Sequence, residues 1–247
     1  MDEADGFGAL RVGCSGWLYR HWRGDFYPAG LRIKDELGYY VGKFDTAELN
    51  ASFYRMPSEA AVTGWRERLP EGFVLAWKAS RYLTHLKRLL EPEEPLAYMF
   101  SRALGLGEKL GPVLYQLPPS MKLDLPRLGA FMAALPKGPR HAFEFRHPSW
   151  YAPEVFELLG RHDASLVLSD HHHAPAPWEA TASWVYVRGH GPGGRYWGDY
   201  EEETLQAWAQ QIRAWRFEGK DVYAYFDNDI GGAAPRDAAR LKRLFNL

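Results

Sequence analysis

The segment HAFEFRHPSW, residues 141–150, alternates two aromatic side chains with two opposite charges. Phe143 and Phe145 share one parity, and Glu144 and Arg146 share the other. Because successive side chains of a strand point to opposite faces, this pattern predicts a strand with one apolar and one charged face. A carboxylate set between phenylalanines and beside a guanidinium has the means to bind an ion or to transfer a proton.

Polar side chains also end the other apolar segments of the chain, nearly all on one parity. If these segments are the parallel strands of one barrel, their carboxyl ends meet at one mouth and alternate side chains enter it. We therefore expect these groups to line a single site. They are Glu48 and Asn50, Lys78, Gln116, Arg188 and His190, and Asp227, Asn228 and Asp229 of the DND end, where the inward residue stays ambiguous.

The expected mouth carries an excess of positive charge. Lys78, Arg146 and Arg188 are set against two carboxylates, Glu48 and Glu144. Unpaired burial of a charge is costly, so these groups must pair with one another or await a ligand. The excess favours an anionic ligand such as a phosphate or carboxylate. The alternative is a charge-balanced plug without chemistry.

Proton transfer in this site would fall first to Glu144. Glu48 and His190 are further catalytic candidates, and His147 is an alternative to His190. Burial raises the pKa of a carboxyl such as Glu144 and a neighbouring guanidinium such as Arg146 lowers it, so the sequence leaves the direction open.

Aromatic residues crowd the loop expected after the first strand, in GWLYRHWRGDFYP. They either cap the barrel or form a wall that stacks on a base or sugar ring, and both readings stay open. Tyr54, past the second strand, belongs to the same question, and Arg81 and His85 are the nearest candidates after the third. The loop aromatics are Trp17, Tyr19, Trp22, Phe26 and Tyr27, of which Trp17 and Tyr19 are taken as substrate-binding candidates.

Metal binding is a weaker interpretation. Asp170 precedes His171, His172 and His173, but neighbouring residues of an extended loop point different ways, so a solvated histidine-rich loop is the competing reading. A scattered site would draw ligands from several strand ends, although the abundance of lysine and arginine there argues against it. Its ligands would be Glu48, Glu144, His147, His190 and Asp229.

Motifs for other chemistry do not occur in the sequence. It has no GxxxxGK[ST] phosphate loop after a strand and no GxSxG elbow, so no organic cofactor is indicated and the cofactor stays unknown. The single cysteine, Cys14, excludes an internal disulfide and is best read as buried filler in a strand.

The periodicity predicts the elements that would position these residues. Helical spacing appears at 58–70 behind Ser58 as N-cap, at 204–215 with one apolar face, and behind Pro153 and Pro235. The alternation predicts a single (β/α)8 TIM barrel over residues 1–247, with 1–9 a flexible tail; a doubly wound open sheet is the alternative. Eight expected strands span 10–17, 43–50, 73–80, 112–118, 141–147, 164–170, 183–190 and 221–229.

The composition of the chain limits the partners and the compartment that can be expected. A formal net charge of -1 offers no global attraction for nucleic acid or membrane, so only a local patch could bind an anionic partner. The first residues lack the pattern of a signal peptide, and no apolar run approaches the roughly 20 residues of a membrane span. We expect a cytoplasmic protein without a membrane partner; oligomeric state is not visible in the sequence.

The serial motifs together resemble the YecE-like proteins, a family of unknown function. They are GWLYRHW, ELNASFYRMP, FVLAWKASRYLTH, VLYQLPPS, FEFRHPSW, VYVRGHG with YWGDY, and YAYFDND, in order from about residue 12 to about residue 240. The resemblance implies a TIM barrel and transfers no reaction. Where the family usually has two asparagines after the final phenylalanine, this chain has Asp227 and Asn228. The family's recurrent polar positions would be matched by Glu48, Asn50, Tyr54, Lys78, His85, Gln116, Glu144, Arg146, His147, Trp150, Arg188, His190, Asn228 and Asp229.

Three functions follow as hypotheses. The first is a barrel enzyme, a hydrolase or lyase, that binds a phosphate-bearing substrate (nucleotide, nucleic acid or sugar phosphate) through Lys78, Arg146 and Arg188. The second is a non-catalytic nucleic-acid-binding module that uses the same basic mouth. The third is a metal-dependent hydrolase centred on Glu48, Glu144, His190 and Asp229.

Overall fold

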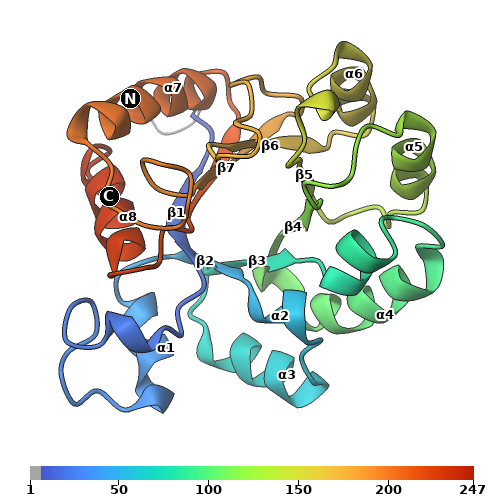
Figure 1. The fold of residues 1–247 in the computed structure, drawn as a ribbon. Helices are drawn as coiled ribbons and strands as arrows, with labels where there is room; N and C mark the ends of the chain where they lie inside the picture. The colour runs from blue at the N-terminus through green and yellow to red at the C-terminus, as the bar shows by residue number, and fades with distance from the viewer. Residues whose placement is uncertain (1–6) are drawn as a thin grey trace.

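The computed structural model, which describes residues 7–247, is a closed barrel of eight parallel strands (Figure 1). The open-sheet alternative is wrong because the first and last strands pair, from Leu10 opposite Val222 to Cys14 opposite Phe226. All eight predicted strands are present. They are β1 (Leu10–Ser15), β2 (Thr46–Leu49), β3 (Val74–Lys78), β4 (Leu110–Gln116), β5 (His141–Glu144), β6 (Ser165–Ser169), β7 (Trp184–Gly189) and β8 (Asp221–Phe226).

Helices surround the strands on the outside of the barrel (Figure 1). Residues 170–183, between β6 and β7, form a loop without a helix, as expected from their sequence. The α-helices are α1 (Glu36–Val41), α2 (Ala51–Tyr54), α3 (Glu59–Arg68), α4 (Glu93–Ala103), α5 (Leu125–Ala133), α6 (Pro153–Arg161), α7 (Glu202–Phe217) and α8 (Ala233–Arg243). Shorter turns are η1 (Arg20–Trp22), η2 (Ile33–Asp35), the π-helical η3 (Tyr82–Leu86), η4 (Leu104–Lys109) and η5 (Pro148–Trp150).

The predicted helix signals act as expected. Ser58 caps α3 by accepting a hydrogen bond from the Ala61 amide at 3.2 Å. Pro153 is the first residue of α6, whereas α8 begins at Ala233, two residues before Pro235. The apolar face of α7, formed by Leu205, Trp208, Ile212 and Trp215, is buried.

The lumen of the barrel is filled by a separate apolar cluster. Tyr186 and Tyr225 stack at 5.1 Å between ring centres, and Thr46 lies beside them with its hydroxyl 2.7 Å from that of Tyr225. Because side chains alternate along a strand, the residue two positions further on points into the lumen again, one layer nearer the carboxyl ends. The cluster consists of Ala76, Leu114, Ala142, Val167, Ala182, Trp184, Tyr186 and Tyr225.

The outward face of β5 agrees with its sequence pattern. Phe143 stacks on Tyr115 of β4 and meets the ring of Phe131 in α5. Phe145 stacks on Trp150 of η5, with 4.7 Å between ring centres. The phenylalanines therefore pack between strand and helix layers, which leaves Glu144 on the lumen side.

The amino-terminal segment was expected to be a flexible tail over residues 1–9. Residues 1–6 of that segment lie outside the described residues. Gly8 donates its amide to Arg216 O at 2.9 Å, and the Ala9 amide donates to Asp221 Oδ1 at 2.8 Å, so this part is attached to the barrel. Among residues 7–247, no helix has both the length and the apolar character needed to cross a membrane.

The cap of α3 gives a test of the fold. Ser58→Ala removes the side chain that satisfies the Ala61 amide and should lower the free energy of unfolding by about 1 kcal/mol. Urea unfolding measures it. Thr63→Ala, on the exposed side of the same helix, is the control; an equal loss in both variants would contradict the cap's contribution.

Candidate functional site

A buried arginine occupies the centre of the barrel mouth. Arg188 of β7 has no solvent exposure. Its Nε and Nη2 donate to Glu48 at 2.9 and 2.6 Å, and its Nη1 donates to Glu144 at 2.8 Å. Nη2 also donates to Asp227, the residue after β8, at 2.9 Å. One guanidinium thus binds three carboxylates from three strand ends.

The predicted excess of positive charge in the mouth is wrong. Asp227 faces the lumen because it continues the parity of Tyr223 and Tyr225, which resolves the ambiguity of the DND end. With Asp227 included, three carboxylates stand against Lys78, Arg146 and Arg188. The charges are therefore balanced, as the plug alternative required.

Arg188 is not available as the predicted clamp for a ligand. Four of its donor contacts are to carboxylates, and the others are to Ser15 Oγ at 2.9 Å and His190 Nε2 at 3.0 Å. A guanidinium without solvent exposure that already binds Glu48, Glu144 and Asp227 has no free direction for a substrate. These contacts indicate that Arg188 stabilises the mouth of the barrel and does not bind a ligand.

His190 is held in a neutral form, which argues against the predicted proton transfer. Its Nε2 receives hydrogen bonds from Arg146 Nη2 at 3.1 Å and from Arg188 Nη1 at 3.0 Å. Guanidinium groups only donate, so Nε2 must accept and the proton resides on Nδ1, 3.2 Å from Asp170 Oδ1. Burial lowers the pKa of His190 well below its ordinary value, and Arg146 and Arg188 act in the same direction against the attraction of Glu144.

Glu144 and Glu48 are held ionised. Burial alone would raise the pKa of Glu144, but Arg146 and Arg188 outweigh it and the pKa lies well below its usual range. Arg146 Nε is 2.5 Å from Glu144 Oε1. Burial likewise opposes ionisation of Glu48, and Arg188 with Lys78 still lowers its pKa. Neither carboxylate is poised to exchange a proton near neutral pH, so the geometry does not support the predicted catalytic roles.

Lys78 differs from the other charges of the mouth. It ends β3 and is 8% exposed, and its Nζ has no hydrogen-bond or ion-pair partner among residues 7–247. Its closest described contact is the ring of Phe53, whose centre is 4.7 Å away. Burial and the charge of Arg188 lower the pKa of Lys78, although three carboxylates, foremost Asp227, act in the opposite direction. Lys78 is a largely buried cation whose ammonium group has no partner among residues 7–247.

Further polar groups lie around Lys78. His85 packs edge-on against Phe53, with 5.1 Å between ring centres, and its Nε2 is 3.5 Å from Gln116 Nε2. Burial, followed by the charge of Lys78, lowers the pKa of His85 to about 4, so its ring is neutral at pH 7. Arg146 donates through Nη1 to the Tyr196 hydroxyl at 3.0 Å. Of these donors, His85 shares the Phe53 ring with Lys78 and Gln116 lies next to His85, whereas Arg146 lies beside Glu144 and His190.

The aromatic loop after β1 caps the barrel and does not form the proposed stacking wall. Trp17 is buried against Tyr40 and Trp65, so it exposes little surface to a substrate. Tyr19 donates its hydroxyl to Ser15 O at 2.6 Å and packs on Trp22. The large aromatic side chains of this loop serve packing, because they contact one another and the rings of α1 and α3.

Other predicted residues have contacts outside the mouth. Asn228 is fully buried and donates Nδ2 to Gly198 O and to Asp237 Oδ2, both at 2.8 Å, so it supports α8. His147 caps η5 by accepting from the Ser149 amide. Asn50 donates through Nδ2 to Ser15 Oγ at 2.8 Å and so helps to position Ser15, which in turn contacts Glu48.

Two more predicted residues lie at the edge of the mouth. The Asp229 carboxylate is 3.4 Å from His21 Nε2, and burial raises the pKa of Asp229 to about 6. Tyr54 is 80% exposed and lies outside the charged centre. The structure therefore separates both from the cluster around Arg188.

The predicted metal ligands do not converge. Glu48 and Glu144 are bound to Arg188, and Asp229 faces His21. The rings of His171, His172 and His173 stack in sequence, with centres 4.4 and 4.2 Å apart, instead of aiming nitrogens at one point. In the part of the chain that the structure describes, no three histidine, cysteine or acidic side chains are arranged to hold an ion.

Sequence reasoning missed several residues of the mouth. Ser15 and Ser169 end β1 and β6 on the lumen parity, a signal that was present in the sequence, whereas Asp227 was one of three candidates just past β8. Tyr196, which binds Arg146, and Asp170, which binds His190, come from loops, where no parity applies. Loop contacts of this kind have no periodic signature.

An eight-stranded parallel barrel with polar side chains gathered at the carboxyl ends of its strands defines a TIM barrel with a charged mouth. The chain belongs to the family described as protein of unknown function DUF72, whose model matches residues 11–247. The resemblance to YecE-like proteins is thereby confirmed.

Relatives and solved structures agree with this placement. The UPF0759 protein YunF of Bacillus subtilis (strain 168) is 25% identical, over 96% of this chain and 95% of its own length. The UPF0759 protein YecE of Escherichia coli (strain K12) is 25% identical over 58% of this chain and 50% of its own length. A DUF72 family protein from Thermotoga maritima superposes with a TM-score of 0.87 and 27% identity, over 97% of this chain and 100% of that one. One from Enterococcus faecalis V583, at 19% identity, covers 96% of each chain with a TM-score of 0.84 and shows the fold alone.

Substitutions that remove the charge of Arg188 and of Lys78 should have different effects on the free energy of unfolding. Arg188→Met leaves three carboxylates buried without a partner and should lower the free energy of unfolding by roughly 3–5 kcal/mol. Lys78→Met removes a desolvated, unpaired ammonium and should leave stability equal or higher. Urea unfolding compares them, and a large loss in Lys78→Met would show that Lys78 belongs to the structural network.

The neutral state of His190 gives a pH test. Its pKa is depressed in the folded protein, so its contribution to stability is present above its ordinary pKa of 6.5 and is lost as the pH falls below it. His190→Gln keeps an acceptor for the arginines but no longer titrates. The stability advantage of the wild type should therefore shrink by about 1.4 kcal/mol per pH unit below 6.5. Urea unfolding at pH 7.5, 6.5 and 5.5 measures it; an unchanging difference would refute the neutral form.

Proposed function

We propose that the chain binds a phosphate-bearing substrate at the mouth of the barrel, with Lys78 as the principal cation. The observation that carries this proposal is the buried, partnerless ammonium of Lys78. Burying a cation without a partner costs free energy, and an anion that supplies the missing contacts recovers it. Natural proteins accept such a cost most often where a ligand is bound.

The donors around Lys78 favour a ligand with several acceptor oxygens. Arg146, Gln116 and neutral His85 come from three other segments, β5, β4 and the turn η3. A phosphate offers three peripheral oxygens for such convergent donors, whereas a carboxylate offers two. Nucleotides, nucleic acids and sugar phosphates share this group. The proposal keeps the chain as a single domain acting in the cytoplasm.

Any catalytic step would use Asp227 in place of Glu144 or His190. Burial raises the pKa of Asp227 despite the opposing charges of Arg188 and Lys78, and the residue is 6% exposed on the mouth side. A carboxyl whose pKa is raised holds a proton more readily than an ordinary carboxylate does, which suits it to proton transfer.

Non-catalytic binding is the second candidate function. It is favoured by the states of Glu144 and His190, which are held ionised and neutral respectively and so are not poised to exchange a proton. A phosphate-binding barrel that lacks turnover would retain binding in Asp227→Asn and show no reaction in the wild type.

Calorimetric titration tests the proposed site with inorganic phosphate and ribose 5-phosphate. The wild type should bind, and Lys78→Met should bind at least tenfold more weakly, a loss of about 1.4 kcal/mol. Lys137→Met makes the same charge change at the opposite end of the barrel, before β5, and should bind as the wild type does. Equal affinity in the Lys78 and Lys137 variants, or no binding by the wild type, would end the proposal.

A further inference from the structure

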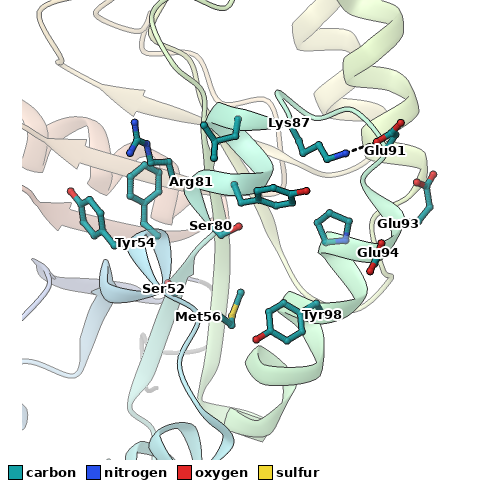
Figure 2. Close-up of a pocket in the computed structure, with 14 residues that line it drawn as sticks. Ser52, Tyr54, Met56, Ser80, Arg81, Lys87, Glu91, Glu93, Glu94 and Tyr98 are labelled. Atoms are coloured by element: carbon teal, nitrogen blue, oxygen red, sulfur yellow. Dashed lines mark hydrogen bonds and ion pairs between the residues drawn. The ribbon is translucent and has the colours of Figure 1, made fainter.

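A pocket of about 850 Å³ lies beside the charged mouth, also at the carboxyl ends of the strands (Figure 2). Three segments form it: the residues after β2, the residues after β3, and the start of α4. Its volume is within the range of sites for small molecules. Phe53 connects it to the mouth, because this ring lines the pocket and is also the one over which Lys78 lies.

The pocket is lined by aromatic side chains that the fold leaves exposed. Tyr54 is 80% exposed, Tyr98 is 54% exposed and Tyr82 is 50% exposed. Leu86 and Met56 extend the same surface. Exposed aromatic groups gathered around one hollow indicate a binding surface, since each keeps half or more of its surface exposed and aromatic faces suit a planar ring.

The two ends of the pocket differ in charge. Arg81 lies on the side of Tyr54, toward the barrel, and Glu93 and Glu94 lie on the opposite side (Figure 2). Lys87 is paired with Glu91 and so contributes little net charge. An occupant that complements this surface has an anionic group at one end and hydrogen-bond donors at the other.

The backbone of the segment after β3 is unusual as well. The turn η3 is π-helical, and Arg88, Leu89 and Glu91 have positive φ angles of 48, 68 and 45°. Such conformations are costly outside glycine and are retained most often at functional sites. The turn directs His85 toward Phe53 and the mouth, while Tyr82 and Leu86 line the pocket.

We propose that this pocket holds the base of a free mononucleotide whose phosphate lies at Lys78. The tyrosine rings stack on the base, the exocyclic amino group donates to Glu93 or Glu94, and Arg81 with Lys78 binds the anionic end. The phosphate end of this inference rests on the proposed function, whereas the base end stands on the pocket alone.

A nucleic-acid strand fits the same surface less well. A strand needs a continuous basic path for its phosphates, and beyond the aromatic surface this pocket ends in Glu91, Glu93 and Glu94. These carboxylates repel a second phosphate but accept hydrogen bonds from an amino group. The chain's net charge of -1 adds no general attraction for a polyanion.

Calorimetric titration with AMP, adenosine and ribose 5-phosphate tests the inference. AMP should bind the wild type at least tenfold more tightly than ribose 5-phosphate does. Tyr54→Ala and Tyr98→Ala should each reduce that ratio severalfold while the affinity for ribose 5-phosphate stays the same. Phe217→Ala, which removes an equally exposed ring at the end of α7, is the control and should change neither affinity.

The possible failures separate the two proposals. If AMP binds no more tightly than ribose 5-phosphate, the base pocket is refuted and the phosphate site survives. If adenosine binds with the same Tyr54 dependence and ribose 5-phosphate does not bind, the base pocket stands and the phosphate site is refuted. An adenylate hexamer that binds more than tenfold more tightly than AMP would overturn the assignment to a free mononucleotide.

Discussion

The mouth of this barrel depends on the pairing of Arg188 with Glu48, Glu144 and Asp227. A guanidinium remains charged in any protein interior, so a fully buried one must be surrounded by acceptors with good geometry. These three carboxylates come from β2, β5 and β8, and Arg188 itself from β7. The contact therefore links four strands in one layer and fixes the protonation of its neighbours, including neutral His190.

The layer of charged side chains at the carboxyl ends of the strands contains both neutralised ion pairs and a cation that can bind a ligand. Most of the charged residues at the strand ends neutralise one another, so the plug interpretation describes them correctly. Lys78 is the exception, because Glu48, Glu144 and Asp227 are bound to Arg188 and, among residues 7–247, its Nζ lies over the Phe53 ring without an ion-pair partner. The proposed function thus depends on Lys78, whose charge the ion pairs around Arg188 do not neutralise.

Strand parity made much of this structure predictable. Alternation in segments such as FEFRH gave the barrel, and it placed Glu144 on the lumen side and Phe143 on the helix side. Parity predicts the side of the strand on which a side chain lies but not the groups that it contacts. It therefore could not reveal that Arg188 is bound to three carboxylates. Trp17 was misjudged for a related reason, since a loop aromatic that packs inward and one that awaits a ligand have the same sequence signature.

The pocket beside the mouth lay beyond such reasoning because three separate segments build it and none is periodic there. Its position nevertheless follows from the fold, since loops at the carboxyl ends of barrel strands converge on one face. Phe53 separates the pocket from Lys78 and contacts His85, so a ligand that shifts this ring changes the surroundings of both.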